Sequence, residues 1–323
     1  MQVGGYMLEV RQLNKHYGNI KSVNNINFIL GENETVGLLG KNGAGKSTTM
    51  RMLAGYIAPT SGEILIDGIS ILENQREVKK RIGYLPEIPP LYSDMTVMEH
   101  LSFVCDLKQI KVKQKKEECE RVCQKMNLGQ VKNRLIAHLS KGYRQRVGFA
   151  AALIGKPKIL ILDEPTVGLD PQQMLEIREL IKTLSKEMSI IISSHVLTEI
   201  SSVCSRIMIL NKGNLVADGK PEDIENKYIH LSELSLIARG DKELVNKLIN
   251  ECLPKNATVS NLADMHYNIT CPMQEEKDNT VNLSEKLFFQ FAKHSPRVSI
   301  IELKNKKATL EDVFITLTKE GIA

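Results

Sequence analysis

A glycine-rich segment constrains the fold of this chain more than any other feature. Residues 40–48 read Gly-Lys-Asn-Gly-Ala-Gly-Lys-Ser-Thr, which fits the pattern Gly-x4-Gly-Lys-Ser/Thr. Apolar residues at 35–39 predict a buried strand before this segment, and residues 48–53 predict a helix after it. Glycines let successive backbone N–H groups converge on an anion, and the helix N-terminus adds positive potential. The segment therefore predicts a phosphate-binding loop; an ordinary glycine-rich turn before a helix is the alternative.

Within this loop the residue types suit different parts of a polyphosphate. The Lys46 ammonium can neutralise the terminal phosphates, and the Ser47 hydroxyl can ligate Mg²⁺. The candidate nucleotide-binding residues are Gly40, Lys41, Asn42, Gly43, Ala44, Gly45, Lys46, Ser47 and Thr48.

A second apolar run, Ile159–Leu162, ends in Asp163 and Glu164. A carboxylate at the end of such a strand can hold Mg²⁺, so Asp163 joins Ser47 as a predicted metal ligand. Glu164 directly follows it and is the predicted general base for hydrolysis, a role that contributes about 10²- to 10⁴-fold in rate.

Composition restricts the class of protein only moderately. The 323 residues suffice for one large domain with a smaller one, or for two domains. A formal charge of +5 gives no reason to expect a nucleic-acid partner. Six cysteines without a Cys-x2-Cys pair indicate reduced thiols. No run approaches the roughly 18 apolar residues of a membrane span, and no signal peptide is expected.

The periodicity of apolar residues changes along the chain. Residues 8–13, 26–29 and 62–68 predict antiparallel strands, and residues 94–153 predict helices, beginning with the capping-box sequence Thr-Val-Met-Glu at 96–99. Strands are also expected at 159–162, 190–195, 206–210 and 215–219, the last two as a hairpin.

Five lysines cluster at residues 108–116 of the predicted helical region: Lys108, Lys111, Lys113, Lys115 and Lys116. A solvated helix face is the ordinary interpretation of this cluster, and contact with anionic lipid headgroups is the alternative.

Two further motifs narrow the class. Residues 139–146 read Leu-Ser-Lys-Gly-Tyr-Arg-Gln-Arg, and residues 164–170 read Glu-Pro-Thr-Val-Gly-Leu-Asp. In this order they resemble the signature, the end of Walker B and the D-loop of the ATP-binding cassette family. The resemblance covers roughly residues 8–225. It implies an α/β P-loop NTPase cassette at 7–228, in which a mixed parallel sheet carries an antiparallel β subdomain and a helical subdomain at about 94–153.

The resemblance also implies roles for single residues. Tyr17 matches the aromatic residue that stacks on adenine. His195 matches the switch histidine, which contacts the γ-phosphate and orients the attacking water. Asp170 lies in the D-loop. In the family, the signature reaches the nucleotide held by an opposite subunit, so two cassettes enclose two ATP molecules. The signature residues here are Ser140, Lys141 and Gly142. Since this chain carries one cassette, the second ATPase subunit is another chain, and a homodimer is expected.

Three positions depart from the family pattern. The signature has Lys141 and Tyr143 where glycine and glutamine are usual, whereas Ser140 and Gly142, which touch phosphate in the family, are present. Glu87 replaces the glutamine expected in a loop at residues 83–87. A carboxylate still offers an oxygen to Mg²⁺, so Glu87 is the third predicted metal ligand, although its charge alters the contact.

The remaining residues, 229–323, are expected to form a small α+β accessory domain. Its elements predict the order βαββαβ, which is that of a ferredoxin-like unit. The expected ranges are 232–240, 242–253, 257–262, 265–270, 281–293 and 298–303. A closing helix at 310–318 resembles the C-terminal helix of ATPases that serve ABC-2-type exporters, such as drug, polysaccharide or gliding-motility systems. An amphipathic helix that closes the accessory domain is its ordinary interpretation.

The resemblance therefore predicts a subunit that binds and hydrolyses ATP, with Mg²⁺ as cofactor. It would power a separate integral membrane permease of the ABC-2 exporter type, from a cytoplasmic, peripheral position on the inner face of the cell membrane. A soluble family ATPase that remodels ribosomes or DNA is the alternative. A nucleotide sensor would be expected to lack the base, yet Glu164 is present.

Overall fold

The computed structural model describes residues 7–227, 233–253, 258–263, 266–270, 283–306 and 309–319. The chain forms two compact units that divide between Pro221 and Glu222. The boundary expected between residues 228 and 229 lies outside the described residues and stays a prediction.

The first unit begins with an antiparallel sheet in the order β2-β1-β4-β5. Leu8 and Val10 are buried on one face of β1, and a bulge at the next two residues returns the chain to that face at Leu13. Gly18 and Asn19 turn the chain into β2. The strands are β1 (Leu8–Tyr17), β2 (Ile20–Leu30), β4 (Ser61–Ile66) and β5 (Ile69–Ser70).

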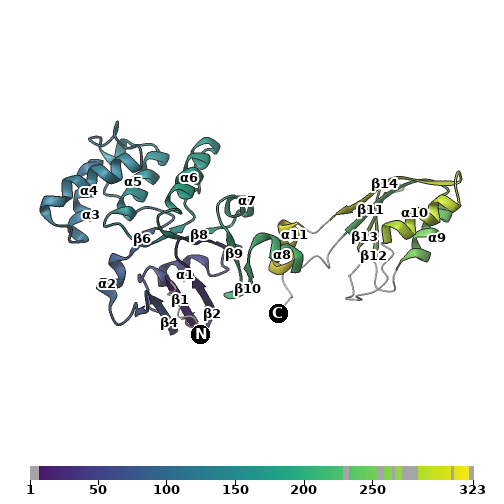
Figure 1. Ribbon diagram of the computed structural model, residues 1–323, viewed down its shortest axis with the longest axis horizontal. Coiled ribbons are helices and arrows are strands. Elements are labelled where there is room, and N and C mark those ends of the chain that lie inside the picture. The colour runs from purple at the N-terminus through teal and green to yellow at the C-terminus, as the bar shows by residue number, and fades with distance from the viewer. Residues whose placement is uncertain are drawn as a thin grey trace. The chain divides into compact units, whose positions relative to one another are not determined.

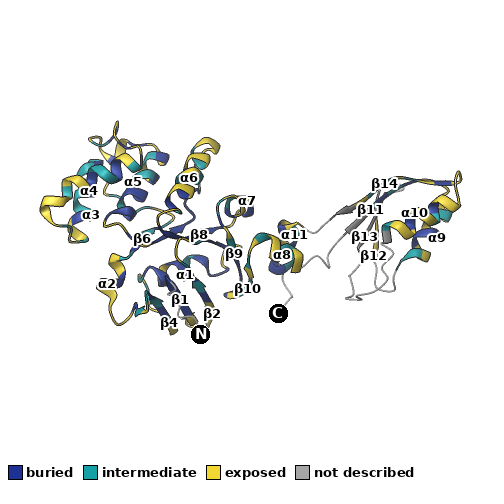
Figure 2. Cartoon of the chain, viewed as in Figure 1, coloured by how far each residue is buried: buried dark blue, intermediate teal, exposed yellow. Residues whose placement is uncertain are grey.

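A six-stranded sheet forms the centre of this unit, in the order β10-β9-β3-β8-β7-β6 (Figure 1). All neighbouring strands are parallel except β10, which pairs with β9 as the predicted hairpin. The strands are β3 (Thr35–Leu39), β6 (Ile82–Leu85), β7 (Ile159–Asp163), β8 (Ser189–Ser194), β9 (Arg206–Asn211) and β10 (Asn214–Gly219). The apolar runs of β3, β7, β8 and β9 are buried, as expected for central parallel strands (Figure 2). Residues 83–85 belong to β6 and not to the loop predicted at 83–87.

One hydrophobic core joins the two sheets through helix α1 (Lys46–Leu53). Met50, Met52 and Leu53 are fully buried in a cluster with side chains of β1, β2, β4, β7 and β8. This packing fixes α1 firmly, so its first residue, Lys46, is held at one edge of the parallel sheet. The helix starts where the sequence predicts it.

The helical part of the unit packs α3 (Val97–Leu107), α4 (Val112–Lys125) and α5 (Lys141–Leu153) against one another. The predicted capping box is present, because the Thr96 hydroxyl accepts from Glu99 N while Thr96 N donates to Glu99 Oε2 over 2.7 Å. The predicted helical subdomain is thus confirmed, and its bounds of 94–153 stay a prediction. The remaining helices of the unit are α2 (Gln75–Lys80), the 3-10 helix Ile136–His138, α6 (Pro171–Leu184) and α7 (Leu197–Ser201).

The surroundings of Lys108 differ from what the sequence predicted. The Lys108 Nζ donates to the carbonyl oxygens of Ile154, at 2.6 Å, and Ala152, at the C-terminal end of α5. Burial lowers the pKa of Lys108 to about 8. The interpretation as a solvated lysine is therefore wrong for Lys108.

The described cysteines are free thiols, and the Sγ atoms of Cys105 and Cys119 lie 3.7 Å apart, whereas a disulfide requires about 2.05 Å.

The second unit contains a four-stranded antiparallel sheet in the order β12-β13-β11-β14. Two helices pack on it around a core that includes Leu236, Leu248 and Leu287. The elements confirm the predicted βαββαβ order, although the first residues expected for four of them lie outside the described residues. They are β11 (Glu233–Gly240), α9 (Lys242–Cys252), β12 (Thr258–Ala263), β13 (His266–Thr270), α10 (Leu283–Lys293) and β14 (Val298–Lys306).

One helix precedes this sheet in the sequence, α8 (Pro221–Lys227), and another follows it, α11 (Leu310–Thr318). The predicted closing helix is present, and the Leu310 N donates to Glu225 Oε1 over 3.1 Å. The structure has no helix, among those it describes, that combines the length and the apolar character needed to cross a bilayer.

Candidate functional site

The loop between β3 and α1 turns tightly because of its glycines. Gly45 adopts a φ of +104°, and a Cβ there would lie 2.4 Å from the Ser22 carbonyl oxygen. Gly43 also has a positive φ, of +80°. A side chain at Gly45 would push α1 away from β2, so this position requires glycine for both conformation and space. The loop backbone is thus held open beside the first turn of α1.

A cavity of about 310 Å³ lies beside this loop. Most residues predicted to bind nucleotide line it, together with the predicted catalytic pair and Glu87; Ser22 and Val167 join them without having been predicted. Gly40 and Ala44 lie in the buried part of the loop. The lining residues are Ser22, Lys41, Asn42, Gly43, Gly45, Lys46, Ser47, Thr48, Glu87, Glu164, Val167 and His195.

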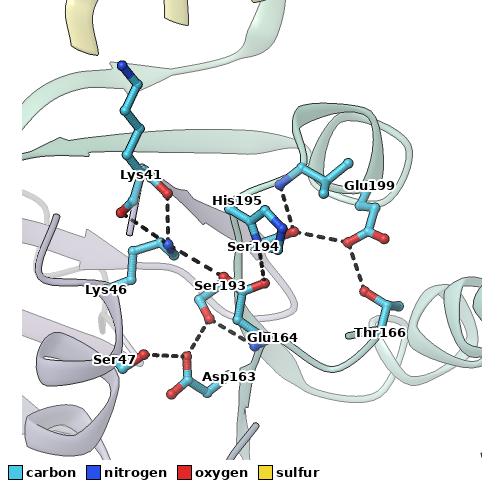
Figure 3. Close-up of polar contacts among 12 residues, drawn as sticks. Lys41, Lys46, Ser47, Asp163, Glu164, Thr166, Ser193, Ser194, His195 and Glu199 are labelled. Atoms are coloured by element: carbon cyan, nitrogen blue, oxygen red, sulfur yellow. Dashed lines mark hydrogen bonds and ion pairs between the residues drawn. The ribbon is translucent and has the colours of Figure 1, made fainter. Parts of the chain in front are cut away.

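Three charged or titratable side chains meet at the centre of this cavity (Figure 3). The Lys46 Nζ donates to the Gly40 carbonyl oxygen over 2.7 Å and lies 3.4 Å from Glu164 Oε1. The other Glu164 oxygen, Oε2, lies 2.9 Å from His195 Nδ1. Both Lys46 and Glu164 are almost fully buried, whereas half of the His195 side chain is exposed. Glu164 therefore has a fixed cation on one side and a ring open to the cavity on the other.

The backbone of Glu164 is strained, with a φ of +49° directly after β7. Residues other than glycine occupy this region at a cost of about 1–3 kcal/mol, and such residues cluster at functional sites. Two hydrogen bonds from Glu164 N, to the Oγ and the carbonyl oxygen of Ser193, hold the conformation. The strained turn directs the carboxylate into the cavity instead of along the strand.

Oxygen ligands gather one residue earlier, at the end of β7. The Ser47 Oγ donates to Asp163 Oδ1 over 3.2 Å, and Ser193 Oγ donates to the same oxygen over 2.6 Å. Glu87 lines the same cavity. Hydroxyl and carboxylate oxygens are the ligands that Mg²⁺ takes in phosphate sites, so the residues present fit this ion.

The Asp163 carboxylate also affects the pKa of Tyr84 in β6. Burial raises the pKa of Tyr84 to about 12, and the nearby Asp163 carboxylate adds to the rise. The Tyr84 phenol therefore stays protonated well above neutral pH.

The predicted signature lies elsewhere on the unit. Ser140 is the N-cap of α5, and its hydroxyl accepts from Tyr143 N. With Gly142 and Asp170 it lines a groove of about 870 Å³ between α5 and α6. No residue lines both this groove and the loop cavity in the described part of the chain. The structure thus brings phosphate loop, Asp163, Glu164 and His195 together, and it keeps the signature apart from them.

Two other predicted residues have distinct surroundings. Tyr17 is half exposed at the β1–β2 turn, and the Lys15 Nζ lies 5.3 Å from its ring centroid. It does not line the cavity. Lys141 extends along Gly168, where an added Cβ would lie 2.0 Å from Lys141 Nζ. Their roles stay predictions.

Sequence reasoning missed a set of polar residues that support the predicted ones. Ser193 bridges Asp163 and Glu164, while Ser194, Thr166 and Glu199 form hydrogen bonds beside His195. One signal was available, because β8 changes from isoleucines to two buried serines at its end. The partners of these hydroxyls could not be read from it.

Comparison with known proteins agrees with this geometry. The family described as "ABC transporter" matches residues 23–167. The bacitracin transport ATP-binding protein of Bacillus licheniformis is 40% identical over 214 residues, which are 66% of this chain and 69% of that protein. The linearmycin resistance ATP-binding protein of Bacillus subtilis (strain 168) is 31% identical over 313 residues, covering 97% of this chain and 98% of the relative.

Solved structures are similar over the first unit. An ATP-binding subunit of an ABC transporter superposes with a TM-score of 0.63 at 30% identity, covering 69% of this chain and 93% of the other. A dimeric ATP-binding cassette in a post-hydrolysis state, bound to ADP and phosphate, has a TM-score of 0.60 at 25% identity, with 66% and 98% covered. These similarities confirm the predicted fold class.

Ser193→Ala should raise the Mg²⁺ concentration needed for half-maximal nucleotide hydrolysis several-fold, because Asp163 Oδ1 loses the shorter of its two hydrogen bonds. Leaving buried partners unsatisfied should also lower the free energy of unfolding by about 1–3 kcal/mol. Ser189→Ala is the matched control, since its hydroxyl donates to Gly31 O at the other end of β8. Magnesium titration of phosphate release should separate the two variants. Equal magnesium dependence would contradict a role for Ser193 in orienting Asp163.

Proposed function

Because this chain belongs to the ABC transporter ATP-binding proteins, we propose that the cavity beside the phosphate loop binds MgATP and cleaves the terminal phosphate to power export. The family assignment makes the chain an ATPase. The observation that carries the proposal is the contact of Glu164 with both Lys46 and His195 inside one cavity.

ATP binding uses the loop backbone and Lys46. The Lys46 ammonium contacts the Gly40 carbonyl and Glu164, and a polyphosphate can replace both through charge-assisted hydrogen bonds. On our proposal the β- and γ-phosphates take this ammonium, which frees Glu164 Oε1 to accept a proton. Tyr17, at the same hairpin as Ser22 of the cavity wall, would stack on the adenine.

The predicted metal ligands would hold Mg²⁺ at the end of β7. Ser47 and Asp163 supply two oxygens already in contact, and Glu87 adds a carboxylate from the segment after β6. The ion supplies neutralisation of phosphate charge. Ser193 holds the Asp163 carboxylate in place by its hydrogen bond, so the ligand does not have to be ordered on binding.

Glu164 acts as the general base, and His195 holds it. The strained backbone and two hydrogen bonds to Ser193 prevent the carboxylate from turning away, and the His195 ring approaches from the exposed side. A water between Glu164 and the γ-phosphate would lose its proton to the carboxylate as it attacks.

A complete site needs a second chain. Ser140, Lys141 and Gly142 lie at the start of α5, beside the groove that contains Asp170 and apart from the loop cavity. The dimeric cassette that this chain resembles supports an arrangement in which the signature of one copy completes the phosphate site of the other. We therefore propose that two identical chains form two such sites.

Transport requires a membrane permease, which we propose to be a separate ABC-2-type chain contacted from the inner face of the membrane. The relatives named for bacitracin transport and linearmycin resistance support an export system. Ile88 directly follows Glu87 of the cavity wall and is 82% exposed, an uncommon environment for isoleucine. A permease segment bound there would be connected to the metal site through one peptide bond.

Glu164→Gln should reduce ATP turnover by roughly 100-fold or more while ATP still binds, because the amide keeps the size of the side chain and loses the base. The ATP-bound paired form should then accumulate. Phosphate release and light scattering with ATP measure the two effects. Glu77→Gln, on the exposed face of α2 and outside both the cavity and the groove, should behave as the unmodified protein. Near-normal turnover in Glu164→Gln would mean that another group activates the water.

Mixing two damaged chains tests the shared site. Lys46→Ala and Ser140→Arg homodimers each carry two damaged sites and should be nearly inactive. In the mixed dimer both lesions fall in one site, and the other site is intact, so ATPase activity should reappear. Lys46→Ala alone should also bind ATP about 1.5–3 kcal/mol more weakly, the value of a charged hydrogen bond. No recovery in a dimer isolated through two different affinity tags would contradict independent sites shared between chains.

Ile88→Glu should detach the chain from membranes. Burying an isoleucine contributes about 1.5–3 kcal/mol, so a charge there should weaken permease binding at least tenfold. Val112→Glu is the control, because Val112 is 83% exposed on α4, outside the proposed contact. Cells that express the tagged chain with the membrane proteins encoded beside its gene should be fractionated and immunoblotted. Sedimentation of the unmodified chain with ribosomes at physiological salt would contradict the transport function.

A further inference from the structure

A second polar cluster lies beside the proposed base and consists of Thr166, Arg178, Ser194 and Glu199; we name it the Glu199 cluster. Glu199 Oε2 accepts from Thr166 Oγ1 over 2.8 Å and from Ser194 Oγ over 3.0 Å (Figure 3). The other oxygen, Oε1, lies 4.0 Å from an Arg178 guanidinium nitrogen. Thr166 and Ser194 are buried. These contacts join three segments that are distant in sequence.

The direction of each hydrogen bond follows from the donors available. Ser194 Oγ accepts from the backbone N of Val196 over 3.0 Å, so its own proton is available for Glu199. This arrangement closes a short turn around His195, with Ser194 before it and Val196 after it. The carboxylate of Glu199 therefore fixes the backbone on both sides of the histidine.

Glu199 itself stands on a rigid base. Its helix, α7, packs directly on β3, where a Cβ on Gly37 would lie only 2.1 Å from the Ile200 side chain. A strand residue with a side chain would force α7 away from the sheet. Because Gly37 allows this close approach, the Glu199 carboxylate has a fixed position. The segments that carry Thr166 and Ser194 are held by their hydrogen bonds to it.

His195 has little else to hold it. Half of its side chain is exposed. Among the described residues, the His195 ring forms one hydrogen bond, with Glu164. Thr166 lies two residues after Glu164, on the segment that leads to Asp170 and α6. Glu199 thus connects the segment that follows the base with the segment that carries the histidine.

We propose that Glu199 is a positioning residue for hydrolysis: by holding Thr166 and Ser194 together, it sets the distance between His195 and Glu164. Through Thr166, Glu199 also links the distance between His195 and Glu164 to residues 166–170. In the proposed two-chain arrangement, this segment faces the partner chain. The inference rests on the proposed roles of Glu164 and His195. Since Glu199 contacts neither the phosphate loop nor a predicted metal ligand, its loss should affect the chemical step and leave ATP binding unchanged.

The test is a double-mutant cycle on the full-length chain, with kcat, KM and ATP affinity measured for Glu199→Ala, His195→Ala and the combination. Glu199→Ala should lower kcat about 10- to 100-fold, as a misplaced catalytic group does, with KM and ATP affinity within twofold. In the His195→Ala background the same change should lower kcat less than about twofold, because residues that act as one unit are not additive.

Thr166→Val and Thr166→Ser form a matched pair that does not alter the carboxylate. Valine keeps the shape and loses the donor, so kcat should fall about 3- to 10-fold if the hydrogen bond orients the segment. Serine keeps the donor, so most of the kcat should return. Should Glu199→Ala fail to fold, judged by its thermal unfolding, this pair decides the proposal.

The outcomes separate the inference from the function on which it rests. Full additivity of Glu199→Ala and His195→Ala, or equal kcat for the valine and serine variants, would overturn the positioning role. A rise in KM with unchanged kcat would also overturn the positioning role, because a defect in ATP binding would then explain the lower kcat/KM. If His195→Ala alone keeps full kcat, the proposed function of the histidine is wrong. That result comes from the single variant and does not depend on Glu199.

Discussion

The parallel alignment of β3, β7 and β8 is the constraint on which the whole site depends. Leu39 pairs with Ser194, and Asp163 pairs with Ser193, so the three strands end side by side. Parallel strands that end together deliver the residues that follow them to one edge of the sheet. The phosphate loop, Glu164 and His195 are those residues. No single strand could bring them within hydrogen-bonding distance.

Burial then determines how these groups behave. Lys46 and Glu164 are almost fully buried, and a buried charge is costly unless it is paired and hydrogen-bonded. Each charge therefore has partners before any substrate binds. The two groups lie 3.4 Å apart, Lys46 also donates to carbonyl oxygens of the loop, and the Glu164 carboxylate also contacts His195. A phosphate entering this cavity replaces one set of strong partners with another. The protein thus holds the groups proposed for catalysis in place through contacts that a bound phosphate can replace.

Much of this could be predicted because the signals are local. The glycine pattern before Lys46, the capping box at Thr96 and the alternation in β1 each depend on neighbours a few residues away. The prediction for Lys108 failed for the opposite reason. Its charge and its place in a lysine-rich stretch indicate solvent, but the end of α5, distant in sequence, brings carbonyl oxygens to its ammonium group.

The sequence by itself determined the phosphate loop, the strand that ends in Asp163 and Glu164, and the βαββαβ order of the second unit, because backbone geometry and apolar periodicity act over short ranges. Only the tertiary structure decided that Ser193 bridges Asp163 and Glu164, that Glu199 joins Thr166 to Ser194, and that the signature lies apart from the loop. A hydroxyl or carboxylate has no periodic pattern that names its partner. Its hydrogen bonds become definite only when packing, such as that of α7 on Gly37, brings distant segments together.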